Sequence, residues 1–126
     1  MKTMESKIII TGLLYLITFI FGIWLSFSGR PLNTAIFSVH KIAALLFIVF
    51  TGVKIVSLIK TTDVTGLILF IIIITAVIIL LSLFSGVWLS LDKKVNELIL
   101  NIHKLSAIPL GISLAFTIYL LANNSK

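Results

Sequence analysis

The chain lacks cysteine and carries few charged side chains. The absence of cysteine excludes disulfides, thiolate metal sites, iron–sulfur ligation and cysteine nucleophiles. Asp, Glu, Lys and Arg make up 11% of the 126 residues, whereas roughly a quarter of an ordinary soluble chain is charged. The four acidic residues all lie in tails or turns. This argues against a proton-coupled carrier, because such a carrier needs an acid within its membrane helices.

Apolar residues are what the chain has in excess, at 60%. A membrane-crossing helix needs about 20 mostly apolar residues, and four stretches reach that length: Ile8–Phe27, Thr34–Ile59, Thr65–Leu91 and Asn96–Ala122. They do not show the alternation of apolar and polar residues that is typical of barrel strands. The formal charge of +6 fits juxtamembrane anchors that face anionic lipid, and not a nucleic-acid partner. The sequence predicts an all-α membrane protein with four transmembrane helices in a lipid bilayer.

Short polar breaks separate the four stretches, so each helix should run antiparallel to the next. This predicts an up-down-up-down bundle within a single transmembrane domain, residues 1–126, built from two tandem helical hairpins. Asn33 and Asn96 are the expected N-caps of the second and fourth helices. The hydroxyls of Thr51, Thr75 and Ser82 are expected to donate to carbonyl groups of their own helices.

The two hairpins, approximately residues 8–59 and 65–122, are copies of one another. Gly-Ile-Trp-Leu-Ser begins at Gly22, and Gly-Val-Trp-Leu-Ser begins at Gly86, 64 residues later. The chain's two histidines, His40 and His103, are 63 residues apart, and each is followed by lysine. Both hairpins run in the same direction, so this is a parallel repeat that should place both turns at one membrane face.

Lys and Arg are spread over both faces, so only the even number of helices favours cytoplasmic termini, in a multi-pass protein of the cell membrane.

The two histidines should lie at the same depth in the membrane. His40 lies seven residues past Asn33, and His103 lies seven residues past Asn96. At 1.5 Å per residue, both are about 10 Å inside the membrane. Ionisable residues at such depth are expensive and indicate function. Two histidines fill only half of a tetrahedral zinc site, but they suit the two axial positions of one heme iron. The alternative is a pair of interface anchors that contact lipid phosphate and water.

Small residues accompany each histidine. In an antiparallel hairpin, residues equally far from the turn share a depth, so Gly22 should lie level with His40, and Gly86 with His103. A glycine at that level leaves room for a porphyrin. Further small residues follow one helical turn beyond the histidines, at Ala44 and Ala107. A plain helix-packing surface would use the same residue types, so this alternative stays open.

Basic residues lie close to the predicted heme in the sequence. Lys41 and Lys104 directly follow the histidines, and each is rotated by about 100° from its neighbour on the helix. A long lysine side chain reaches a heme propionate or extends to the membrane surface. Arg30 and Lys93, in the two turns, are further candidates for propionate contacts.

The combination of Gly-x-Trp-Leu, a polar turn and a buried His-Lys resembles the small bacterial membrane b-type cytochromes, and in particular the flavinylation-associated cytochromes. The residues that carry the resemblance lie in both hairpins: Gly22–Leu25 with Val39–Lys41, and Ser85–Leu89 with Ile102–Lys104. The resemblance implies four membrane helices and heme b held by axial histidines. Many of these cytochromes have a second histidine further along the same helices. This chain has Val53-Lys54 and Phe116-Thr117 there, so no second bis-histidine site is expected.

The sequence thus predicts a membrane cytochrome b with one heme b per chain, held by His40 and His103. One heme near one face leaves most of a core of about 30 Å uncrossed, so electron transfer is expected at that face and not across the membrane. An electron-transfer protein fits better than a stand-alone enzyme. Its partner would be a quinone or a membrane or extracytoplasmic redox protein, and an oligomer is compatible with the sequence. The alternative function is a heme-free accessory or structural membrane subunit with interfacial histidines.

Overall fold

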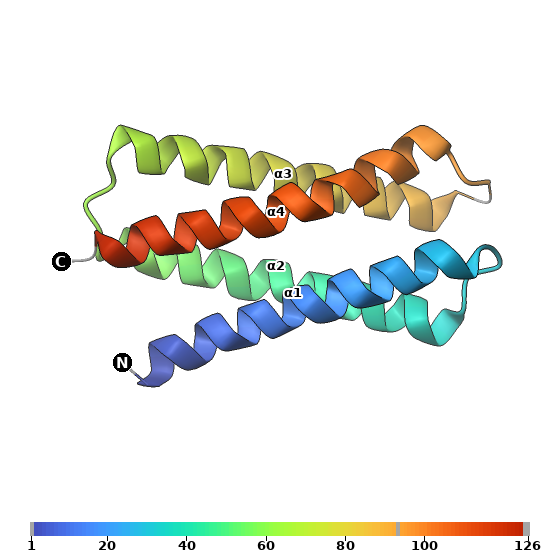
Figure 1. Cartoon of the computed structure of the whole chain (residues 1–126), viewed down its shortest axis with the longest axis horizontal. Helices are drawn as coiled ribbons and strands as arrows, with labels where there is room; N and C mark the ends of the chain where they lie inside the picture. Colours follow the sequence, from blue (N-terminus) through green and yellow to red (C-terminus); the bar gives the residue numbers. More distant parts are fainter. Residues whose placement is uncertain (1, 93, 125–126) are drawn as a thin grey trace. The chain divides into compact units, whose positions relative to one another are not determined.

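The computed structural model describes residues 2–92 and 94–124, most of which belong to four α-helices (Figure 1). These are α1 (Lys2–Ser28), α2 (Thr34–Ile59), α3 (Gly66–Leu91) and α4 (Glu97–Asn123). The bounds of α2 are those predicted, and α3 and α4 agree with the prediction to within one residue at each end. α1 begins six residues earlier than predicted. Hydropathy marks the stretch that lies in lipid, whereas the helical hydrogen bonds continue into the polar residues that precede Ile8.

All four helices are long and apolar enough to cross a membrane. Their candidate spans contain 21, 26, 26 and 27 residues. At 1.5 Å per residue, even the shortest extends about 32 Å, which covers a hydrocarbon core of about 30 Å. Large apolar side chains are widely exposed, as at Phe27 and Leu91, which are 86% and 79% accessible. The chain is therefore an all-α, multi-pass membrane protein, as the sequence predicts, and lipid is its expected surrounding.

The chain divides into two compact units, Met1–Ser57 and Leu58–Lys126. The first unit consists of α1 and nearly all of α2, and is called hairpin 1 below. The second contains α3 and α4, and is called hairpin 2; α3 and α4 pack against each other along their length (Figure 1). Each hairpin corresponds to one copy of the sequence repeat. The single domain of residues 1–126 stays a prediction.

Two asparagines begin α2 and α4, which confirms the predicted caps. The Asn33 Oδ1 accepts two backbone N–H groups at 3.0 and 3.2 Å, and the Asn96 Oδ1 accepts two at 3.1 and 3.3 Å. These bonds satisfy amide groups that have no partner inside the helix. In hairpin 1 the turn also uses Gly29, whose φ of 67° lies in the left-handed region that glycine adopts most easily. The caps fix where each histidine-bearing helix starts.

Hairpin 1 packs through aromatic rings. The Tyr15 ring of α1 lies 5.6 Å from the Phe47 ring of α2 and 6.0 Å from the Phe19 ring, centroid to centroid. Thr51, on α2, is 1% exposed, and its Oγ1 has no hydrogen-bond partner among the described residues. The prediction that Thr51 bonds to its own helix is wrong. A helical threonine has two accessible χ1 rotamers, and not every rotamer directs the hydroxyl to the preceding turn.

Hairpin 2 is joined by hydroxyl groups. Thr75 Oγ1 lies 2.9 Å from a carbonyl of its own helix, as predicted, and 3.0 Å from the Oγ1 of Thr117 on α4. Thr117 lies 2.8 Å from a carbonyl of its own helix, so the two hydroxyls bond each other when one of them directs its proton across instead of to its own carbonyl. The Ser82 and Ser106 hydroxyls are 2.7 Å apart, also across the two helices. Ser106 donates to the carbonyl of His103, so the Ser82 proton goes to Ser106. The prediction that Ser82 bonds to its own helix is wrong, because its hydroxyl bonds Ser106 on the neighbouring helix.

Candidate functional site

Each hairpin places its histidine against its glycine. A Cβ atom added to Gly22 would lie 3.0 Å from the Cε1 of His40, and one added to Gly86 would lie 2.9 Å from the Cε1 of His103. Carbon atoms do not approach so closely without displacement, so a larger residue at either position would require the imidazole ring to shift. The predicted equal depth of each glycine and its histidine is confirmed. The space that the glycine leaves is filled by the imidazole ring itself, and a contact with porphyrin stays a prediction.

A backbone carbonyl on the preceding helix bonds each imidazole. His40 Nδ1 donates to the Thr18 carbonyl at 2.9 Å, and His103 Nδ1 donates to the Ser82 carbonyl at 3.0 Å. A carbonyl oxygen can only accept, so Nδ1 carries the proton in both rings. In a neutral imidazole the Nε2 atom then holds the lone pair. Thr18 and Ser82 each precede the glycine of their hairpin by four residues, so the two copies build the same arrangement from the same backbone positions.

The small residues beyond the histidines are half-buried. Ala44 and Ala107 both have intermediate exposure, and their neighbours Ala43 and Ser106 are buried at 6% and 9% accessible. Residues four apart on a helix share a face, so these alanines continue the face that carries the imidazole. Packing of Ala44 and Ala107 against a heme stays a prediction.

The lysines that follow the histidines are both exposed. The Lys41 Nζ lies 4.4 Å from the centroid of the Phe37 ring, one turn nearer the start of α2. Its side chain therefore extends toward the polar turn, the direction expected of a lysine that reaches for a membrane surface. Arg30 is exposed as well, and Lys93 lies outside the described residues. Propionate contacts of Lys41 and Lys104 stay predictions.

Sequence reasoning missed three residues that contact the imidazoles. Thr18 and Ser82 act through their backbone carbonyls, so their side chains gave no direct signal. Ser85 is the third, and its Oγ lies 3.0 Å from the Nδ1 of His103. Alignment of the two copies at an offset of 64 places Phe21 opposite Ser85, so the repeat gave no sign of this contact.

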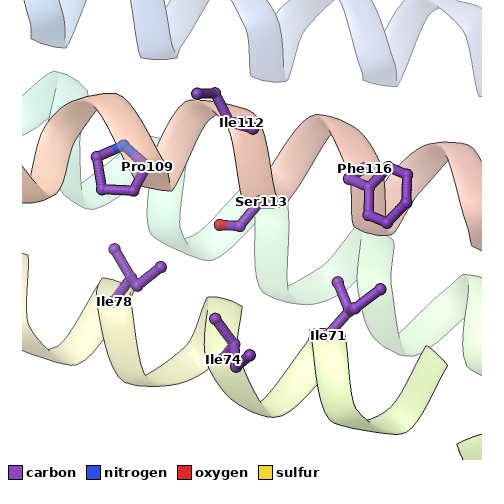
Figure 2. Close-up of a pocket in the computed structure, with 7 residues that line it drawn as sticks. All are labelled: Ile71, Ile74, Ile78, Pro109, Ile112, Ser113 and Phe116. Carbon is purple, nitrogen blue, oxygen red and sulfur yellow. The ribbon is translucent and has the colours of Figure 1, made fainter. Parts of the chain in front are cut away.

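An apolar groove lies elsewhere on hairpin 2, between α3 and α4 (Figure 2). It has a volume of about 310 Å³, and Ile71, Ile74, Ile78, Ile112 and Phe116 form most of its wall beside Pro109 and Ser113. The hydroxyl of Ser113 donates to a carbonyl of its own helix at 3.2 Å. The groove therefore offers shape for a hydrocarbon chain but no acid, base or nucleophile, and it contains none of the predicted site residues.

The chemistry that the arrangement supports is ligation. Each hairpin has one histidine, whose Nδ1–H bonds a carbonyl of the preceding helix, so in the neutral ring the lone pair is on Nε2. One hairpin can thus supply one imidazole ligand. Comparison of the chain with protein-family models, curated proteins and solved structures gave no match.

Proposed function

We propose that the protein is a membrane cytochrome of the b type, which holds one heme through His40 and His103, one axial ligand from each hairpin. The observation that carries the proposal is the bond from each Nδ1–H to a carbonyl of the preceding helix, at 2.9 and 3.0 Å. Histidines that ligate metals almost always donate their other ring N–H to a carbonyl, carboxylate or water. Both histidines meet that condition at equivalent places of the repeat.

The proposed role of the surrounding residues is to hold and orient the two imidazole ligands, His40 and His103. The carbonyl bond selects the tautomer in which Nε2 is the ligand. The space beside Gly22 or Gly86, called the glycine notch below, receives the ring and fixes its plane. The apolar helices exclude water. A bound heme iron supplies a one-electron couple, and ligation by two imidazoles closes both axial positions, which suits electron transfer and not oxygen activation.

The proposed partner lies at the membrane face of the two turns. The histidines are about seven residues, or about 10 Å, from the caps of their helices, so the heme would be nearer that face than the other. A quinol in the membrane or a redox protein at that surface is the expected donor or acceptor. In this proposal Lys41 and Lys104 serve the propionates, and the protein lies in the cell membrane with cytoplasmic termini.

A second function is favoured by the same contacts. An imidazole that fills a glycine notch and bonds a carbonyl of the neighbouring helix joins the two helices of a hairpin without any metal. On this alternative the protein is a heme-free accessory subunit, and each histidine is a structural clasp. The two proposals differ in whether the Nε2 lone pair is needed.

Asparagine variants separate the two proposals. The Asn side-chain Nδ2 can replace the Nδ1 donor of histidine, but asparagine has no lone pair corresponding to Nε2. The full chain is purified from heme-replete cells as wild type, His40→Asn and His103→Asn, and oxidised-minus-reduced absorption spectra are recorded. Thermal unfolding of each in detergent, followed by circular dichroism, serves as the control for folding. Trp24→Phe, which changes an exposed side chain of the repeat motif, is the matched control for heme loading.

The cytochrome predicts a low-spin b-type spectrum in the wild type and in Trp24→Phe. It predicts that the spectrum is lost in both Asn variants while their helix content stays unchanged. A colourless wild-type protein, or an unchanged spectrum in His40→Asn, would exclude bis-histidine heme ligation. A colourless wild type whose Asn variants unfold at the wild-type temperature would support the clasp alone.

A further inference from the structure

We propose that Ser85 is a positioning residue for His103, and that its hydroxyl makes His103 a stronger electron donor to heme iron than the same ring would be without it. The inference rests on the proposed heme function and goes beyond it, because it assigns a residue that tunes one of the two ligands. Ser85 Oγ lies 3.0 Å from the Nδ1 of His103, and the carbonyl oxygen of Ser82 lies at the same distance from that atom. The two oxygens thus share one ring nitrogen.

The proton positions follow from the acceptors. The Ser82 carbonyl cannot donate, so the proton between it and His103 belongs to Nδ1. Ser85 is then an acceptor toward the ring, and its own proton goes to the Leu81 carbonyl, 2.6 Å away, or to that of Ser82, 3.1 Å away. His103 Nδ1–H therefore makes a three-centre bond with a carbonyl and a hydroxyl. Ser85 is 8% exposed, so these bonds are shielded from water.

A second pair of hydroxyls supports this side of the ring. Ser106 donates to the carbonyl of His103 at 2.9 Å, and Ser82 donates to Ser106 at 2.7 Å. These bonds link the residue that carries the imidazole to the residue whose carbonyl accepts from it. Ser82 is thereby held at both its hydroxyl and its carbonyl, which keeps the acceptor in place.

Hairpin 1 has no hydroxyl at two of the three corresponding positions. At the repeat offsets of 64 and 63, Phe21 corresponds to Ser85 and Ala43 corresponds to Ser106. Neither phenylalanine nor alanine carries a side-chain acceptor. Thr18 corresponds to Ser82, but its hydroxyl donates to the Leu14 carbonyl of its own helix at 2.8 Å. The hydroxyl cluster of Ser82, Ser85 and Ser106 is thus a property of hairpin 2.

An acceptor on Nδ1–H increases the electron density of the ring. As the N–H proton is drawn toward the acceptor, the imidazole gains imidazolate character and Nε2 becomes a stronger donor. A stronger axial donor favours ferric over ferrous iron, so it lowers the midpoint potential. The Ser85 hydroxyl adds this effect to His103, and Phe21 cannot add it to His40.

The first test is a potential titration of heme-loaded full-length protein. Ser85→Ala removes the acceptor and should raise the midpoint potential, whereas Ser85→Thr keeps a hydroxyl and should return it to the wild-type value. Phe21→Ser, which supplies a hydroxyl beside His40, should lower the potential. Ser90→Ala is the matched control on the same helix, because it removes a hydroxyl that donates to the Val87 carbonyl. An unchanged potential in Ser85→Ala, with low-spin heme retained, overturns the tuning role.

The second test needs no heme, so it separates failure of this inference from failure of the proposed function. Protein with ¹⁵N-labelled histidine is prepared from heme-deficient cells, and the ring nitrogens are observed by NMR. The Nδ1 of His103 should be protonated, and Ser85→Ala should shift the resonance of His103 while leaving that of His40 in place. A His103 ring with its proton on Nε2, or no shift in Ser85→Ala, overturns the inference whether or not the wild type binds heme.

Discussion

The two hairpins hold their histidines in the same way but pack by different means. In both, a glycine receives the imidazole and a carbonyl four residues earlier accepts from Nδ1. Around this common arrangement, hairpin 1 packs Tyr15 against Phe47, whereas hairpin 2 pairs Thr75 with Thr117 and Ser82 with Ser106. The difference shows that the imidazole position depends on backbone groups of the preceding helix, and not on one particular set of packing side chains.

The largest expected loss of stability comes from a substitution at the glycine notch, the feature that both hairpins share. Gly86→Ala puts a Cβ atom 2.9 Å from the His103 ring, so the ring must move and its bond to the carbonyl weakens. Overpacking of this kind costs about 1–3 kcal/mol, offset in part by the gain of about 0.5–1 kcal/mol when alanine replaces a helical glycine, and Gly22→Ala, at 3.0 Å, should behave similarly. The free energy of unfolding in detergent, from denaturant titration followed by circular dichroism, measures the change.

Gly12→Ala is the matched control for the notch, because nothing lies within 4 Å of a Cβ atom there. Replacement of a helical glycine by alanine in open space stabilises by about 0.5–1 kcal/mol, so the control should change in the opposite direction. Equal stability of Gly86→Ala and Gly12→Ala would show that the imidazole does not occupy the notch.

The asparagine caps test whether the two hairpins are equivalent at their turns. Asn33→Ala and Asn96→Ala each remove an oxygen that accepts two backbone amides. Loss of such a cap costs about 1 kcal/mol, and the two losses should agree, since the distances are nearly the same. Asn33→Ser and Asn96→Ser, which keep an acceptor, should retain most of the stability in the same unfolding titration.

The buried threonines sharpen the contrast between the hairpins. In a double-mutant cycle with Thr75→Val and Thr117→Val, the hydroxyl pair of hairpin 2 should give a coupling energy of about 0.6 kcal/mol, the average for such bonds in membranes. Thr51→Val in hairpin 1 removes a buried hydroxyl without a partner among the described residues. It should leave stability unchanged or raise it, because an unsatisfied polar group is lost. Destabilisation by Thr51→Val would contradict the contrast.

The two lysines give a further comparison between the hairpins. Lys41→Gln removes a cation 4.4 Å from the Phe37 ring, and an exposed cation–π contact contributes about 0.5–1 kcal/mol. Lys104 has Leu100 where Lys41 has Phe37, so Lys104→Gln should change stability less. A double-mutant cycle with Phe37→Leu isolates the contact. Coupling near zero would show that Lys41 does not depend on the ring.

The sequence was sufficient for the features that depend on local patterns. Apolar length predicted the four helices, Asn33 and Asn96 were recognised as caps, and distance from the turn placed each glycine level with its histidine. It did not predict the start of α1, because hydropathy reports the extent of lipid contact and not the helix end. It also missed the clasp of the imidazole and the hydroxyl cluster. A carbonyl acceptor leaves no mark on residue identity, and the direction of a hydroxyl depends on which neighbour is nearest.

The glycine notch has a consequence for the energetics of the proposed heme ligation. Each imidazole is ordered when the hairpin folds, since the ring already has its orientation and tautomer from Gly22 or Gly86 and the carbonyl beside it. Fixing a free side chain at the moment of association would cost roughly 0.5–1.5 kcal/mol. Folding bears that entropy loss in advance, so the affinity for an incoming metal would be greater than that of a flexible histidine at the same depth.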